Sequence, residues 1–315
     1  MGEKIVLSAE GNVTASINPN NGQLVSLILG TTELLHGGGK SDSDSSKTAQ
    51  DRTGPQYSEF IAFPVVGYNG AVNERNIVGF GRSASFPVGE NGLAPSLAVK
   101  NIQQISKNQA VVSYSYKSFK KIENLENHFE SANLDAQVPS TLYLPFSFDI
   151  KKTFKLERKL EVEIELTNHD SSSASSFGYA LGWTLFFRQS VTPQHGFVRL
   201  NENSSESVHH LWFTDLLKNK KEGKLKLITD AAGTEVYYYN GGDGVKFDLL
   251  SSMPDVGINA FSNGSFSLTP LTKLYEGDGK INLGPDYSYK HTLKPGETHK
   301  YRIVVDAKLK DYIQL

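Results

Sequence analysis

Three consecutive segments between residues 142 and 187 most constrain what this chain can fold into. Residues 146–150 alternate between apolar and polar side chains, and residues 160–166 alternate between aliphatic side chains and glutamates. This period of two predicts β-strands with one buried and one wet face. After a turn-forming tract at 168–173, residues 177–187 are almost wholly aromatic, apolar or Gly. Such a strand is buried on both faces, so we expect residues 177–187 to form one central strand that carries the site.

Short strand-like segments of the same kind recur along the whole chain. The 28 Gly, 14 Tyr and 17 Phe residues fit a protein built from strands and turns. We therefore predict an all-β fold. No repeat, linker or shift in composition divides the sequence, so we expect a single domain over residues 1–315.

Charge and hydropathy exclude several classes of partner. The net charge of −2 and the pI of about 6.5 indicate neither a nucleic acid nor an anionic membrane surface. No apolar run approaches the roughly 18 residues that a membrane span needs. The first residues lack the apolar centre of a signal peptide, so we expect a cytoplasmic protein.

The sequence offers no set of residues that would hold a metal or another cofactor. Cysteine is absent, which excludes disulfides, thiolate ligands and a Cys nucleophile. Residues 42–46 begin like a calcium loop, but Lys47 and Thr53 stand where that loop needs Gly and Glu. His209 and His210 are adjacent, so on a strand they point to opposite faces. We therefore expect no cofactor.

Several short segments, taken in order, resemble aldose 1-epimerases, the galactose mutarotase-like proteins. They are Gly22-Gln23-Leu24-Val25-Ser26-Leu27 with Glu33-Leu34-Leu35, then Phe63-Pro64-Val65-Val66-Gly67, Leu144-Pro145-Phe146-Ser147-Phe148, the strand 164–168 that ends in Asn168, and Leu293-Lys294-Pro295-Gly296-Glu297. Their order and spacing carry the resemblance, which covers nearly the whole chain. It implies a galactose mutarotase-like β-supersandwich.

The resemblance also implies a chemistry, in which a carboxylate and two His move protons at the anomeric carbon of a sugar. Matching the family's H-G-F-A-R, G-x-H-P-x-F and I-E-P segments to this chain puts Asn91, Thr184 and Thr269 at the His, His and Glu positions. Asn and Thr form hydrogen bonds but cannot transfer a proton near neutral pH. The resemblance thus implies a sugar site without the usual acid–base residues.

Four further residues are candidates for the same site. Arg75 falls where the family places an Arg that contacts the sugar, and its structural alternative is a surface ion pair. Trp183 and Trp212 suit stacking on a sugar if they line a cleft, and otherwise they fill the core. His195 begins His195-Gly196-Phe197-Val198-Arg199, which matches H-G-F-A-R at four of five positions but follows the central strand instead of preceding it. Its structural alternative is a turn before a strand.

Three hypotheses about function follow from these residues. The first is a protein that binds a mono- or oligosaccharide, including a divergent sugar epimerase that acts at the anomeric carbon. The second is an active aldose 1-epimerase with a rearranged site that uses His195 and a carboxylate. The third is a non-catalytic β-sandwich that binds a protein partner. The identity of the sugar, the recognition of a sugar phosphate and the oligomeric state stay open.

Overall fold

The structure is a computed structural model that describes some segments of the chain. These are residues 4–35, 59–62, 65–67, 76–78, 97–116, 122–123, 141–142, 148–169, 177–179, 181–187, 197–202, 208–212, 226–228, 231–240, 243–260, 266–272 and 291–310. They form strands and turns, with no helix among them. The prediction of an all-β fold is confirmed.

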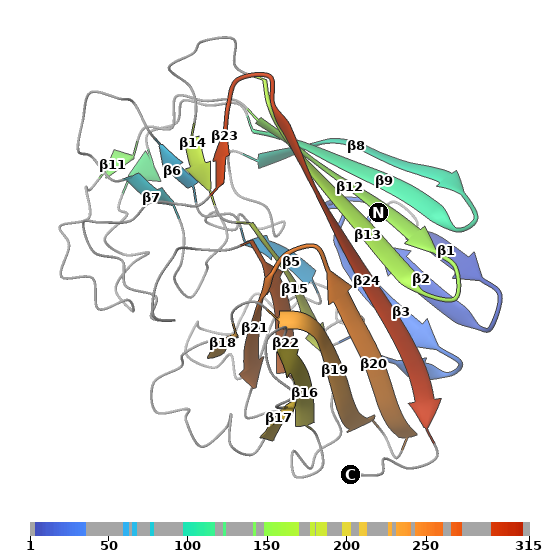
Figure 1. Ribbon diagram of the computed structural model, residues 1–315. Helices are drawn as coiled ribbons and strands as arrows, with labels where there is room; N and C mark the ends of the chain where they lie inside the picture. The colour runs from blue at the N-terminus through green and yellow to red at the C-terminus, as the bar shows by residue number, and fades with distance from the viewer. Residues whose placement is uncertain are drawn as a thin grey trace.

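A nine-stranded antiparallel sheet is the largest layer and crosses the molecule diagonally in Figure 1. Its strands, in spatial order, are β17 (Val208–Trp212), β16 (Phe197–Glu202), β19 (Ala231–Asn240), β20 (Asp243–Ser251), β24 (Thr298–Lys310), β13 (Leu160–Asn168), β12 (Phe148–Leu156), β9 (Gln109–Tyr116) and β8 (Leu97–Ser106). The alternating segments noted in the sequence are β12 and β13, which pair in register through a tight hairpin. β13 lies beside β24 and β12 beside β9, so both are interior strands of the sheet.

Four smaller sheets accompany the large one. A five-stranded sheet contains β18 (Lys226–Ile228), β21 (Asp255–Ala260), β22 (Phe266–Leu271), β15 (Gly182–Phe187) and β5 (Glu59–Ala62). An N-terminal sheet contains β1 (Ile5–Ala9), β2 (Val13–Ile17), β3 (Leu24–Leu29) and β4 (Thr32–Glu33). The remaining two contain β23 (His291–Leu293), β14 (Phe177–Tyr179), β6 (Val65–Gly67) and β7 (Asn76–Val78), and β10 (Ile122–Glu123) with β11 (Thr141–Leu142).

The expectation of one central strand over residues 177–187 is wrong. The segment forms two strands, β14 and β15, which belong to different sheets. The chain is fixed between them by Thr272, whose backbone N–H donates to the Leu181 carbonyl at 2.8 Å and whose Oγ1 accepts from the Leu181 N–H at 2.9 Å. Uniform apolarity along 177–187 does not reveal a change of sheet, because both strands consist of the same kinds of residue.

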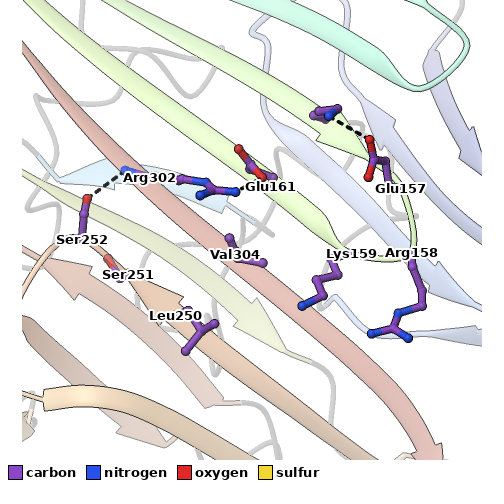
Figure 2. A pocket seen from close by; sticks show the side chains of 10 residues that line it. Glu157, Arg158, Lys159, Glu161, Leu250, Ser251, Ser252, Arg302 and Val304 are labelled. Atoms are coloured by element: carbon purple, nitrogen blue, oxygen red, sulfur yellow. Dashed lines mark hydrogen bonds and ion pairs between the residues drawn. The ribbon is translucent and has the colours of Figure 1, made fainter.

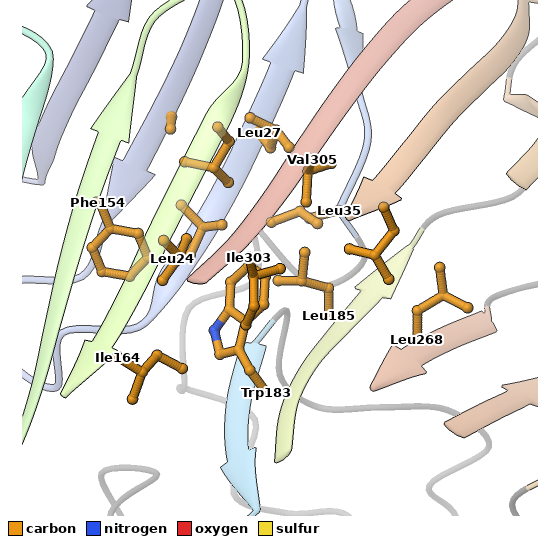
Figure 3. Packing of buried hydrophobic residues seen from close by; sticks show 14 of the residues in the cluster. Leu24, Leu27, Leu35, Phe154, Ile164, Trp183, Leu185, Leu268, Ile303 and Val305 are labelled. Carbon is orange, nitrogen blue, oxygen red and sulfur yellow. The ribbon is translucent and has the colours of Figure 1, made fainter. Parts of the chain in front are cut away.

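The core lies between the inner face of the large sheet and the smaller sheets that pack on it. The inward residues of β12 and β13 belong to one hydrophobic cluster with side chains of the N-terminal sheet, of β15 and of β22 (Figure 3). Leu24, Phe154, Trp183 and Ile303 lie together in this cluster and are completely buried. The outward glutamates of β13 instead pair with cations of neighbouring strands, as Glu161 does with Arg302 at 2.6 Å.

Segments that resembled family motifs form contacts that hold the framework together. Ser26 donates its hydroxyl to Glu33, and the same carboxylate accepts the backbone N–H groups of Leu27 and Leu35 at 2.9 and 3.0 Å. Asn168 ends β13 and meets the turn between β23 and β24: its carbonyl accepts from Gly296 N–H at 2.9 Å, and its side-chain amide donates to Leu293. Residues far apart in the sequence are therefore joined through their polar groups.

Gly22 closes the turn at residues 18–22, where its N–H donates to the Asn18 carbonyl, and a side chain does not fit there. Its φ is +68°, and a Cβ would lie 2.2 Å from Val112 Cγ1 and 2.7 Å from the Tyr114 hydroxyl. Gly296 has a similar φ of +74°, but a Cβ there would meet nothing within 4 Å. Comparing the two glycines therefore separates the free-energy cost of a left-handed backbone from the free-energy cost of a steric clash.

We expect Gly22→Ala to destabilise the protein clearly more than Gly296→Ala. Both substitutions force a side chain into the left-handed region, at about 1–2 kcal/mol, and only Gly22→Ala adds overpacking of about 1–3 kcal/mol. Urea unfolding of the two variants measures the difference. Equal losses of unfolding free energy would contradict the close approach of β9 to this turn.

Candidate functional site

A buried carboxylate, that of Glu59, joins three sheets of the molecule. Glu59 belongs to β5 and its exposed fraction is 0%. One carboxylate oxygen accepts from Lys152 Nζ at 2.6 Å and from Trp183 Nε1 at 2.7 Å. The other accepts from the backbone N–H of Leu24. Lys152 lies in the nine-stranded sheet, Trp183 in the five-stranded sheet and Leu24 in the N-terminal sheet, so a single side chain connects all three.

Lys152 is the counter-ion of this carboxylate inside the core. It is 1% exposed, and its Nζ also donates to the Gly22 carbonyl at 3.0 Å. The ammonium lies 5.0 and 5.4 Å from the ring centroids of Phe154 and Tyr114. Burial lowers the pKa of Lys152 because it disfavours the charged form, and the Glu59 carboxylate opposes that shift. Burial and the Glu59 charge both raise the pKa of Tyr114.

The turn that precedes β3 supplies the remaining partners of this cluster. The Tyr114 hydroxyl donates to the Asn21 carbonyl at 2.9 Å, and Gln23 Nε2 donates to the Glu59 carbonyl at 3.0 Å. The Asn21 side chain donates to Gln23 Oε1 at 2.8 Å. These bonds satisfy polar groups that would otherwise be buried without partners, which is the condition for keeping an ion pair in a core.

Thr184 and Thr269 meet on the opposite face of β15. Trp183 points into the core, so the next residue, Thr184, points to the other side of the five-stranded sheet. The Thr184 and Thr269 hydroxyls are 2.8 Å apart, and the two residues are 2% and 5% exposed. The match to the family segments had placed these two threonines in one site, and the structure brings them together.

The same face carries a buried carboxylate that the sequence reasoning missed. Asp255 of β21 is 1% exposed and stands opposite Leu271, while Gly257 stands opposite Thr269. Asp255 is therefore a diagonal neighbour of Thr269, at about 7–8 Å in such a ladder. Its strand, with the sequence DVGINA, alternates too weakly to show which face a given residue would occupy.

The other predicted site residues are placed as follows. Trp183 is completely buried, with its indole against Glu59 and not beside Thr184. Trp212 ends β17, where its backbone pairs with Phe197, and its side chain is not among those that the structure describes. Arg75, Asn91 and His195 lie outside the described residues.

Lys152 and Glu59 were also missed, although the sequence held a signal for the lysine. The alternation that puts Phe148, Ile150 and Phe154 inward puts position 152 inward as well, and the structure shows the pattern unbroken along β12. A Lys in an inward position needs a buried partner. No comparable pattern marks Glu59, since β5 contains only four residues.

A hollow of about 550 Å³ lies on the outer face of the nine-stranded sheet, near the β12–β13 hairpin (Figure 2). Leu250 and Val304 form its floor, and Lys155, Arg158, Lys159 and Arg302 stand around it with Glu157 and Glu161. Arg302 holds the pKa of Glu161 below its ordinary value through a hydrogen bond. Ser251 and Ser252 also line the hollow, but none of its lining residues is aromatic, so it has no ring on which a sugar could stack.

Two further observations concern membranes and metals. None of the residues that the structure describes belongs to a helix able to cross a membrane. Within the same residues, no three His, Asp or Glu side chains gather in a way that could hold a metal ion.

Comparison with known proteins gives a clear result for the fold. No protein-family model and no curated protein sequence matches this chain. Among solved structures, a galactose mutarotase-like protein from Lactobacillus casei superposes with a TM-score of 0.57 at 15% identity, covering 97% of this chain and 100% of the other. The chain has the galactose mutarotase-like fold.

Two more solved structures agree with this result. A homologue of aldose epimerases from C. elegans has a TM-score of 0.56 at 12% identity, covering 98% of this chain and 99% of its own. A galactose mutarotase-related enzyme from Lactobacillus acidophilus has a TM-score of 0.57 at 12% identity, covering 99% and 100%. The predicted architecture is thereby confirmed, and at these identities the likeness concerns the fold.

We expect Lys152→Met to be strongly destabilising, by about 3–5 kcal/mol, because it leaves the Glu59 charge buried without a counter-ion. The double variant Glu59→Gln with Lys152→Met should recover part of this loss, since it removes both charges. Recovery stays partial because a Gln has one acceptor oxygen for the N–H groups of Trp183 and Leu24.

Urea unfolding gives the unfolding free energies of the parent, of Lys152→Met and of the double variant, with Lys151→Met as the control. Lys151 is the next residue, is 45% exposed in its side chain and pairs with Glu165 on the surface. Its removal should change the unfolding free energy by no more than about 1 kcal/mol. If Lys152→Met is no worse than this control, Glu59 and Lys152 do not form the buried ion pair described above.

Proposed function

We propose that this protein binds a neutral mono- or oligosaccharide on the face of the five-stranded sheet that carries Thr184 and Thr269. The observation that carries the proposal is the pair of hydroxyls on adjacent strands, 2.8 Å apart. Hydroxyls both donate and accept hydrogen bonds, as sugar hydroxyls require. The mutarotase-like fold of the chain supports the same proposal, because the two residues stand where the family resemblance puts catalytic groups.

The chemistry of these two residues favours binding over proton transfer. Neither hydroxyl ionises near neutral pH, so Thr184 and Thr269 can orient a sugar but cannot act as the acid and base of ring opening. A bound sugar would form hydrogen bonds with the Thr184 and Thr269 hydroxyls in place of the bond that they form with each other. The proposal therefore assigns the protein to carbohydrate binding.

We expect the double variant Thr184→Val with Thr269→Val to bind sugar about 3- to 100-fold more weakly than the parent, because one or two hydrogen bonds to the ligand are lost. Its stability should be almost unchanged, since replacing both partners of a buried hydrogen bond by apolar groups of the same shape is nearly neutral. Isothermal titration with a panel of common mono- and oligosaccharides measures the affinities.

Thr234→Val is the matched control for this experiment. Thr234 is a buried threonine of β19, in the nine-stranded sheet, with an exposed fraction of 2%. Its substitution should leave sugar affinity as it is in the parent. If no sugar in the panel gives heat or a thermal shift with the parent protein, carbohydrate binding is refuted and a protein-binding role is favoured.

Asp255 supports a second candidate function, epimerisation at the anomeric carbon with a rearranged site. A carboxylate near the two threonines has the chemistry of a general base that removes the proton of the C1 hydroxyl. The acid that completes the exchange would have to come from elsewhere, and His195 is the candidate that the sequence suggests.

If this second function holds, polarimetry will show mutarotation of α-glucose or α-galactose well above the rate in buffer. Asp255→Asn should then lower that rate by about 10²–10⁴-fold, the contribution typical of a general base. Asp306→Asn is the control, because Asp306 is a buried carboxylate of the nine-stranded sheet beside Lys159 and Lys308. An activity that survives in Asp255→Asn would remove Asp255 from the reaction.

A further inference from the structure

The ladder between β15 and β22 is interrupted at the candidate site. Gly182 pairs with Leu271, and pairing resumes only at Leu185 with Leu268. The positions between are Trp183 and Thr184 on β15, opposite Pro270 and Thr269 on β22. Pro270 has no backbone N–H to give to the ladder. The ladder therefore lacks at least this backbone bond next to the place where the two hydroxyls meet.

On its other side, β15 is held by β5 without interruption. Trp183 pairs with Ile61, Thr184 with Phe60 and Leu185 with Glu59. However, β5 is the edge strand of this sheet and has four residues, so it offers little support of its own. What fixes β5 to the rest of the molecule is Glu59, through its bonds to Lys152 and to the N-terminal sheet.

Glu59 also fixes β15 directly through the indole of Trp183. The N–H donates to the carboxylate at 2.7 Å from a completely buried ring. Because Trp183 and Thr184 are consecutive, the anchor on the core face determines where the Thr184 hydroxyl stands on the other face. The positions of β15 and of the Thr184 side chain thus depend on the same carboxylate, that of Glu59.

We propose that Glu59, neutralised by Lys152, is a positioning residue of the sugar site: through Trp183 and β5 it holds Thr184 opposite Thr269 where the ladder is interrupted. The inference rests on the proposed function for the identity of the ligand. Glu59 touches no sugar, and its role is to preorganise the two hydroxyls to within the few tenths of an ångström that a binding site needs.

The experiment uses Trp183→Phe, which removes the indole N–H, keeps an aromatic ring and leaves Glu59 with Lys152. Two measurements are made well below the melting temperature of each protein. The first is sugar affinity by titration. The second, without sugar, is the NMR spectrum of threonine methyl groups, in which the signals of Thr184 and Thr269 are assigned by their loss in the Thr→Val variants.

The control is Ile303→Val, a core substitution in β24 with no hydrogen bond to lose. Ile303 is completely buried in the same hydrophobic cluster (Figure 3). We expect Trp183→Phe to shift the methyl signals of both threonines and to weaken sugar binding by about 3- to 30-fold. In Ile303→Val, both readouts should match the parent.

The outcomes separate this inference from the proposed function. If the parent binds no sugar, the proposed function fails, and the methyl signals alone decide: shifted signals in Trp183→Phe support positioning by Glu59, and unshifted signals overturn it. If the parent binds sugar but Trp183→Phe binds it within twofold of the parent, or its methyl signals move no more than in Ile303→Val, the inference is overturned.

Discussion

The bonds of the Glu59 carboxylate are the interaction on which the arrangement of the three sheets depends. A carboxylate without exposure to water would be very unfavourable alone, and Lys152 at 2.6 Å makes it tolerable. The remaining lone pairs are used by the indole of Trp183 and the backbone of Leu24. Each partner comes from a different sheet, so the requirement to satisfy one buried charge also sets how the sheets meet. Apolar packing alone would permit many relative placements.

Polar contacts of the same kind recur elsewhere in the framework. Ser26 with Glu33 ties the β3–β4 turn, and Asn168 ties the end of β13 to the turn before β24. These residues belong to the segments on which the family resemblance rested. Their role in the structure is to join elements that are distant in sequence. These two segments could therefore indicate the architecture, since each forms a contact between elements of the fold.

The two faces of the five-stranded sheet carry different kinds of residue. One face packs on the core through Trp183 and its neighbours, and the other carries Thr184, Thr269 and Asp255. Neutral hydroxyls suit the recognition of sugar hydroxyls, while a single carboxylate supplies at most half of an acid–base pair. Where Pro270 interrupts the ladder, the hydrogen bond between the Thr184 and Thr269 hydroxyls links the two strands. Contacts on the core face therefore influence where the polar groups of the opposite face lie.

By itself, the sequence indicated the fold class and the two amphipathic strands β12 and β13, because alternation is a local signal, and the family resemblance put Thr184 and Thr269 in one site. The sequence led to the wrong prediction of one strand over residues 177–187, since the residue types of β14 and β15 are alike and do not mark the change of sheet. Lys152 was visible as an inward lysine, but its partner was not. Only the tertiary structure decided that Glu59 lies beside it, because that contact joins residues 93 positions apart across two sheets, and no local pattern encodes a pairing of that kind.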